Sequence, residues 1–122
     1  MVEYKLEVIV LPVADVDRAK EFYRRIGFRE DLDYVDDDFR VVQFTPPGSA
    51  ASIVVGSGIG AAAPGSMESV YLAVGDIEEA RSDLIRRGVE VTFADDGSVA
   101  SFADPDGNGF LLQEISERFP GR

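Results

Sequence analysis

The chain has 122 residues, of which 45% are hydrophobic and 29% charged, the ordinary balance of one compact globular domain. It contains no cysteine and no histidine, which excludes disulfides, thiolate nucleophiles, sulfur-bound zinc and imidazole catalysis. The formal net charge of -11 disfavours nucleic acid as a partner, and no apolar run approaches the roughly 20 residues that span a bilayer. We therefore expect a cytoplasmic protein that binds neither nucleic acid nor membranes.

The first half of the chain predicts one strand, one helix and three further strands. An apolar extended run leads to Asp15, whose carboxylate can accept hydrogen bonds from the first-turn amides of a helix. Apolar residues then recur at helical spacing until Gly27, which supplies the left-handed conformation that ends a helix. Turn-forming residues, including Asp36–Asp38 at a hairpin tip, separate the later strands. These strands are expected at residues 28–35, 39–45 and 50–56.

Two patterns in this half are typical of ligand-binding loops but lack essential residues. The acidic run 31–38 has neither the central glycine nor the closing glutamate of an EF-hand calcium loop, and we interpret it as a solvated hairpin tip. The glycine-rich run 56–60 is not followed by Gly-Lys-Ser/Thr, and Pro64 interrupts any helix, so no phosphate-binding loop is expected. Residues 57–65 are small and uncharged, which indicates a linker.

The second half of the chain repeats the first. Residues 74–89 align without a gap on residues 13–28, at an offset of 61. The identical pairs are Val13/Val74, Asp15/Asp76, Ala19/Ala80, Arg25/Arg86 and Gly27/Gly88. The repeat predicts a second helix that Asp76 caps, with Glu79 completing a capping box. Strands are expected after it at residues 89–94, 98–103 and 109–116, with a hairpin tip at Asp95–Gly97.

Each half is therefore expected to be a β-α-β-β-β module, and the chain a single domain over residues 1–122. We place module one at 1–56, the linker at 57–65 and module two at 66–119.

The sequence resembles the vicinal-oxygen-chelate superfamily of glyoxalases, bleomycin-resistance proteins and dioxygenases at residues 11–28, LPVADVDRAKEFYRRIGF, and 102–114, FADPDGNGFLLQE. The resemblance implies an α+β fold in which two tandem βαβββ modules form an open curved mixed sheet around a cavity. It also implies a homodimer, because members commonly complete or share that cavity between two copies. Within the second motif we interpret Asp104 and Asp106 as turn-formers, since Pro105 presets a tight corner.

The resemblance also implies where a metal would be held, because metal-dependent members bind it with side chains from the first and last strands of each module. The matching positions are Val8, Ser69, Ser52 and Leu111. A valine, two serines and a leucine cannot make the oxygen and nitrogen site that divalent metals require. A slip of alignment that brings in Gln113 or Glu114, or the Glu7 carboxylate beside Val8, still leaves the site incomplete. We therefore expect no metal and no cofactor.

Strand alternation predicts the residues that line the cavity. If Val8 and Ser69 face it, every second residue along their strands faces it too. The predicted ligand-binding residues are Val8, Val10, Ser52, Val54, Ser69, Tyr71, Leu111 and Gln113. This apolar lining with a few hydrogen-bonding groups is typical of a small-molecule site. Ser52, Ser69 and Tyr71 have the alternative interpretation of satisfied structural groups.

Three functions are open at this point. The favoured one is a metal-independent protein that binds a small organic molecule, similar to the family members that sequester an antibiotic between two copies; the acidic surface favours a cationic or aromatic ligand. The first alternative is an enzyme of lyase, isomerase or dioxygenase type that acts without metal or with a non-standard site, through Tyr71, Glu114 or bound water. The second is a dimeric interaction module whose cavity is filled by its own side chains.

Overall fold

A computed structural model of the chain describes residues 1–94 and 96–115. The first half contains β1 (Val8–Pro12), α1 (Val16–Arg25), β2 (Arg29–Val35), β3 (Arg40–Thr45) and β4 (Ser52–Ser57). The second half contains β5 (Val70–Val74), α2 (Ile77–Arg86), β6 (Thr92–Phe93), β7 (Val99–Ala103) and β8 (Gly109–Glu114). The predicted order of elements is confirmed. Residues 116–119, which the predicted second module includes, and Asp95 of the predicted hairpin tip lie outside the described residues.

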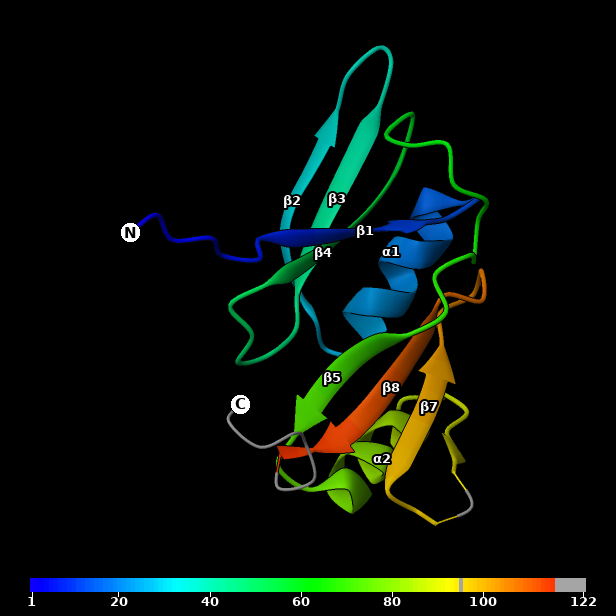
Figure 1. The fold of residues 1–122 in the computed structure, drawn as a ribbon. Helices are drawn as coiled ribbons and strands as arrows, with labels where there is room; N and C mark the ends of the chain where they lie inside the picture. The colour runs from blue at the N-terminus through cyan, green and yellow to red at the C-terminus, as the bar shows by residue number, and fades with distance from the viewer. Residues whose placement is uncertain (95, 116–122) are drawn as a thin grey trace.

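Each half forms its own four-stranded mixed sheet (Figure 1). The strand order is β1-β4-β3-β2 in the N-terminal sheet and β5-β8-β7-β6 in the C-terminal sheet, with the first two strands of each order parallel. Among the described residues, no strand of one sheet pairs with a strand of the other. The predicted α+β fold of two βαβββ modules is therefore confirmed, and within one chain it consists of two separate sheets.

Both helices begin and end where the repeat predicts. Asp15 accepts a hydrogen bond from Arg18 N at 3.1 Å, and Asp76 accepts two, from Glu78 N and Glu79 N. Gly27 and Gly88 follow the helices with φ of 90° and 88°, the left-handed region that glycine occupies without strain. Each helix has ten residues, and no helix in the described part of the chain is long and apolar enough to cross a bilayer.

The predicted capping box of α2 is only half formed. Asp76 Oδ1 accepts from Glu79 N at 3.1 Å, but among the described contacts Glu79 does not accept from the Asp76 amide. Glu114 Oε1 accepts from Ile77 N, the first amide of the helix, at 3.0 Å. Glu114 comes from β8, 37 residues away, so it binds the end of β8 to the first turn of α2. A carboxylate at this position also suits the positive end of the helix dipole.

The strand predicted at residues 89–94 is much shorter in the structure, where only Thr92–Phe93 pair with β7. The backbone before it serves the end of α2, since Val89 N donates to Leu84 O at 3.0 Å. The Val89 side chain is 7% exposed and packs in the core. Val89 is therefore buried as a core strand residue would be, but its backbone does not pair with another strand.

Helix α1 packs against the helix-facing sides of both sheets. The Tyr23 ring lies 5.6 Å from Phe44 of the N-terminal sheet and 6.1 Å from Phe110 of the C-terminal sheet, centroid to centroid. Phe22 approaches Phe102 at 6.5 Å, and all five aromatic side chains belong to one buried cluster. Because both sheets turn the same sides toward α1, their other faces point away from this junction. We call these other faces the N-terminal and C-terminal open faces.

The turn between β7 and β8 connects the two halves through hydrogen bonds. The buried carboxylate of Asp104 accepts from Asp106 N, Asn108 N and Asn108 Nδ2, all at 2.9 Å, which confirms its role as a turn-former. It also accepts from Tyr23 OH on α1 at 2.7 Å. Burial, together with the neighbouring Asp104 charge, raises the pKa of Tyr23 and keeps its hydroxyl protonated.

Three further bonds from this turn reach α1 and the segment before it. Asp106 Oδ1 accepts from Ala14 N and from Arg18 Nη2, both at 3.0 Å. Asn108 Nδ2 donates to Pro12 O at 2.8 Å. The motif interpreted from the sequence as a tight corner is thus also the hydrogen-bonded junction between the modules.

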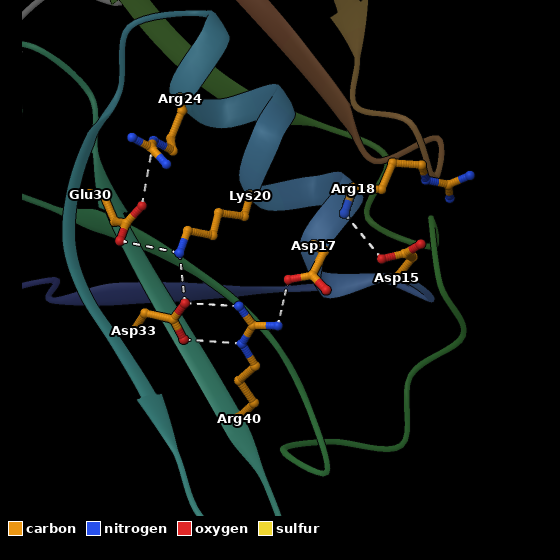
Figure 2. Close-up of polar contacts among 8 residues, drawn as sticks. All are labelled: Asp15, Asp17, Arg18, Lys20, Arg24, Glu30, Asp33 and Arg40. Carbon is orange, nitrogen blue, oxygen red and sulfur yellow. Dashed lines mark hydrogen bonds and ion pairs between the residues drawn. The ribbon is translucent and has the colours of Figure 1, made fainter.

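Charged side chains tie α1 to β2 and β3 (Figure 2). Asp33 accepts two hydrogen bonds from Arg40, at 3.0 and 2.8 Å, and one from Lys20 Nζ at 2.8 Å. Arg40 also donates to Asp17 at 2.8 Å, and Lys20 forms an ion pair with Glu30 at 3.6 Å. The bonds from Arg40 and Lys20 hold the pKa of Asp33 well below its usual range. Every charge in this network has a partner, so we assign the network a structural role.

Replacing Asp33 with asparagine is expected to remove part of the acid sensitivity of the fold. Because the pKa of Asp33 is lower in the folded than in the unfolded protein, its stabilisation is present above about pH 4 and is lost as the pH falls toward the folded value. Asp33→Asn should cost about 1 kcal/mol at pH 7 and less at pH 3. Thermal unfolding between pH 3 and 7 measures this difference, with Asp37→Asn at the exposed hairpin tip as the control. An unchanged pH slope in Asp33→Asn would contradict the assignment.

Candidate functional site

The cavity residues predicted in the first half lie together on the N-terminal open face. Val8 and Ser52 are register partners across β1 and β4, and so are Val10 and Val54. Leu11 points to the opposite side and is fully buried under α1. Val8 and Val10 are 36% and 44% exposed, so apolar surface lies open here.

A β-bulge in β2 enlarges this apolar surface. The register shifts between Glu30 and Leu32, which leaves Asp31 as the extra residue of the bulge. Glu30 faces α1, and in a regular strand Leu32 and Tyr34 would face it too. After the shift Leu32 lies opposite Gln43 on the open face, and Leu32 and Tyr34 are 43% and 50% exposed. The bulge thus reverses which side chains of β2 face α1 and which lie on the open face.

A chain of polar groups crosses the N-terminal open face among these apolar residues. Thr45 Oγ1 donates to Asp31 Oδ2, and the Thr45 and Ser52 hydroxyls lie 2.6 Å apart. Gln43 Nε2 lies 3.4 Å from Asp31 Oδ2, and Arg29 Nε donates to Asp31 Oδ1 at 2.6 Å. The bonds from Thr45 and Arg29 lower the pKa of Asp31, so this carboxylate is ionised at neutral pH. Of these five residues, only Ser52 was predicted from the sequence to line a cavity.

The remaining predicted cavity residues lie on or beside the C-terminal open face. Tyr71 is the register partner of Leu111, and Gln113 lies between Ala73 and Val99. Tyr71 is 62% exposed. Ser69 is exposed and directly precedes β5. The C-terminal open face therefore combines apolar residues such as Leu111 with the polar side chains of Tyr71, Gln113 and Ser101.

One chain does not bring the two predicted groups together. Val8, Val10, Ser52 and Val54 lie on the N-terminal sheet, whereas Ser69, Tyr71, Leu111 and Gln113 lie on or beside the C-terminal sheet. The open faces point away from the junction that α1 makes between the sheets, so the groups do not face each other within the chain. A single cavity lined by both groups requires a second copy.

The register corrects one step of the repeat alignment. Val10 and Tyr71 are separated by the repeat offset, and their partners are Val54 and Leu111. Leu111 therefore corresponds to Val54, not to Ser52. The side chains of Val54 and Leu111 are both aliphatic, so neither could coordinate a metal ion.

The residues at the family's metal positions do not fit a divalent metal ion. These positions offer at most two hydroxyl oxygens as ligands, because they are occupied by Val8, Ser69, Leu111 and either Val54 or Ser52. Within residues 1–94 and 96–115, no three histidine, cysteine, aspartate or glutamate side chains gather in a way that could hold a metal ion. Glu114, which a slip of alignment would bring in, lies at the N-terminus of α2 and accepts from Ile77 N.

A cavity of about 480 Å³ lies between the two halves, a volume within the range of small-molecule sites. Its lining is mainly apolar and includes Ile26, Pro46, Leu72, Leu84 and Leu112. Tyr71 lines this cavity and also belongs to the C-terminal open face, so the cavity opens beside that face. Pro46, Pro47 and Gly48, which follow β3, also border this cavity, and no local pattern in the sequence indicated this.

Two tandem βαβββ modules, each with an apolar open face, define a domain of the vicinal-oxygen-chelate class. The family model for the Glyoxalase/Bleomycin resistance protein/Dioxygenase superfamily matches residues 5–112, and the chain belongs to this superfamily. A comparison with curated proteins gives no significant match.

Solved structures support this membership. TnmS3, an antibiotic binding protein from Streptomyces sp. CB03234, is 30% identical with a TM-score of 0.80, and the alignment covers 93% of this chain and 98% of that one. A glyoxalase/bleomycin resistance protein from the same organism is 31% identical with a TM-score of 0.76, covering 89% and 99%. The trypanothione-dependent glyoxalase I of Leishmania major, 20% identical with a TM-score of 0.70 and coverage of 93% and 88%, shares the fold.

Proposed function

We propose that the protein binds a small organic molecule, an antibiotic or a metabolite, without a metal, in a cavity that two copies share. The observation that carries this proposal is the exposure of large apolar side chains on both open faces, including Val10, Leu32, Tyr34 and Tyr71 at 43 to 62%. Apolar surface of this kind in a globular protein marks a binding or association site. Its location in the cytoplasm, expected from the sequence, stays a prediction.

The arrangement of the sheets supports a homodimer. Each open face supplies one wall of a cavity, and α1 keeps the two walls of one chain apart. If the N-terminal open face of one copy lies over the C-terminal open face of its partner, the walls enclose two equivalent cavities. Such a two-fold arrangement buries the exposed apolar residues of both faces in both copies.

One solved relative, TnmS3, supports ligand binding. TnmS3 is an antibiotic binding protein and shares 30% of aligned residues over nearly the whole chain. The alternative of a metal-free enzyme gains little from its candidate groups: Glu114 is engaged at α2, and Asp31 and Asp33 have lowered pKa values that make them weak bases. The alternative of a filled interaction module is favoured by one observation, the burial of Ser52 and Val54 at 8% and 6% exposure within the N-terminal open face.

Thermal melting of protein purified without a metal-affinity tag tests the proposal. An organic ligand from a screen weighted to cationic and aromatic compounds should stabilise the protein by about 2.7 kcal/mol at a hundredfold excess over Kd. Nickel, zinc, manganese, iron(II) and a chelator should leave the melting temperature unchanged. Stoichiometric metal by elemental analysis, or a strong stabilisation by one ion, would overturn the metal-free proposal. Dimers that bind no compound would support the interaction module.

A further inference from the structure

We propose that Asp31, Thr45 and Ser52 form a hydrogen-bond relay on the N-terminal open face that selects ligands carrying an N–H or O–H donor. This inference rests on the proposed ligand binding and specifies the chemical group that the site recognises. It draws on three residues from three strands, β2, β3 and β4, which the sheet places in contact.

The direction of the protons in the relay follows from the chemistry of its first member. An ionised carboxylate can only accept hydrogen bonds. The hydroxyl group of Thr45 therefore uses its single proton to donate a hydrogen bond to Asp31. Thr45 then has no proton to give to Ser52, and the 2.6 Å contact must be a bond from Ser52 Oγ to Thr45 Oγ1. Ser52 has thereby used its own proton. What remains on its oxygen is acceptor capacity, which a ligand satisfies only with a donor.

Gln43 adds a second acceptor of the same kind. Its Nε2 points to Asp31 Oδ2 at 3.4 Å, so its amide oxygen is left to accept. Gln43 is the register partner of Val54, and Val8 is the partner of Ser52. The two acceptors are therefore set among aliphatic side chains. A ligand that buries these residues without offering donors leaves polar groups unpaired, which costs binding free energy.

Arg29 reduces the contribution that the negative charge of Asp31 makes to the choice of ligand. Its Nε donates to Asp31 Oδ1 at 2.6 Å, so the carboxylate already has a cationic partner. Neutral hydroxyl donors should therefore bind as well as ammonium groups. The same bond and that of Thr45 lower the pKa of Asp31, which makes it a weak base and makes activation of Ser52 as a nucleophile unfavourable. The relay is thus suited to recognition.

Three naphthalene probes of matched shape test the inference on the full chain. 2-Naphthol carries a neutral donor, 2-(aminomethyl)naphthalene a cationic one, and 2-methoxynaphthalene none. Calorimetric titration of wild type should show both donor probes binding about tenfold more tightly than the ether. In the double variant Ser52→Ala/Gln43→Leu, which lacks both acceptors, this difference should fall below about twofold, whereas Ser57→Ala, at the exposed end of β4, should keep it.

Equal affinities for the three probes in wild type, a difference that survives in Ser52→Ala/Gln43→Leu, or no binding of any probe would overturn the inference. Carboxyl carbon NMR tests the relay without a ligand: Thr45→Val should raise the pKa of Asp31 toward its usual range, and an unchanged titration means that no relay exists. The same experiments distinguish failure of the inference from failure of the proposed function. A ligand without donors from the compound screen would support small-molecule binding and contradict the role of the relay in selecting ligands. A relay that titrates as expected, together with a screen that yields no ligand, would contradict small-molecule binding.

Discussion

Replacing Asp104 with alanine is expected to destabilise the protein by about 3 kcal/mol or more. Its carboxylate is 5% exposed and accepts four hydrogen bonds, from the Tyr23 hydroxyl, the amides of Asp106 and Asn108, and the Asn108 side chain. Alanine would leave these donors unpaired in a buried junction. Since domains of this size are stable by only about 5–15 kcal/mol, the loss is a large share of the total.

Urea unfolding followed by circular dichroism measures this effect. Tyr23→Phe removes one of the four bonds and should cost about 1 kcal/mol. Asp37→Ala, at the exposed hairpin tip, should stay within about 0.5 kcal/mol of wild type. A cost below 1 kcal/mol for Asp104→Ala would show that the β7–β8 turn does not hold the two halves together.

Introducing a charge on the N-terminal open face, as Val10→Asp, is expected to dissociate the proposed homodimer. Val10 is 44% exposed in the single chain, so an aspartate there is solvated and leaves the monomer folded. In the dimer the same carboxylate would be buried against the partner without a cation to pair with it, which is strongly unfavourable. We expect dimerisation to weaken at least about a hundredfold, equivalent to about 2.7 kcal/mol.

Sedimentation equilibrium of wild type and variants checks this prediction. Ile85→Asp is the matched control, because Ile85 is 46% exposed on α2, away from both open faces. A dimeric Val10→Asp variant with wild-type affinity would exclude the N-terminal open face from the interface. Dissociation by Ile85→Asp instead would place the interface on α2.

Much of the fold was predictable because it depends on local patterns that occur twice. The caps at Asp15 and Asp76 and the stops at Gly27 and Gly88 act within one helical turn of their own backbone. The strand positions followed from alternation and turn residues. The failures were also local in origin: the residues around Val89 have the composition of a strand, but their backbone is used to end α2.

The candidate site was predictable only in part. Alternation along β1 and β5 selected Val8, Val10 and Tyr71, and the structure places them on open faces; their contact with a ligand stays a prediction. Alternation did not select Leu32 and Tyr34 for an open face, because one inserted residue, Asp31, reverses the phase of β2.

By itself, the sequence determined the family, the two-module order and the helix ends, since these depend on residue type and on spacing within a few positions. Only the tertiary structure decided which distant side chains meet: Asp104 with Tyr23 across 81 residues, and Asp31 with Thr45 and Ser52 across three strands. It also showed that α1 turns the two open faces apart. The physical reason is that hydrogen-bond partners across a sheet or a domain junction are fixed by register and packing, which no short sequence window contains.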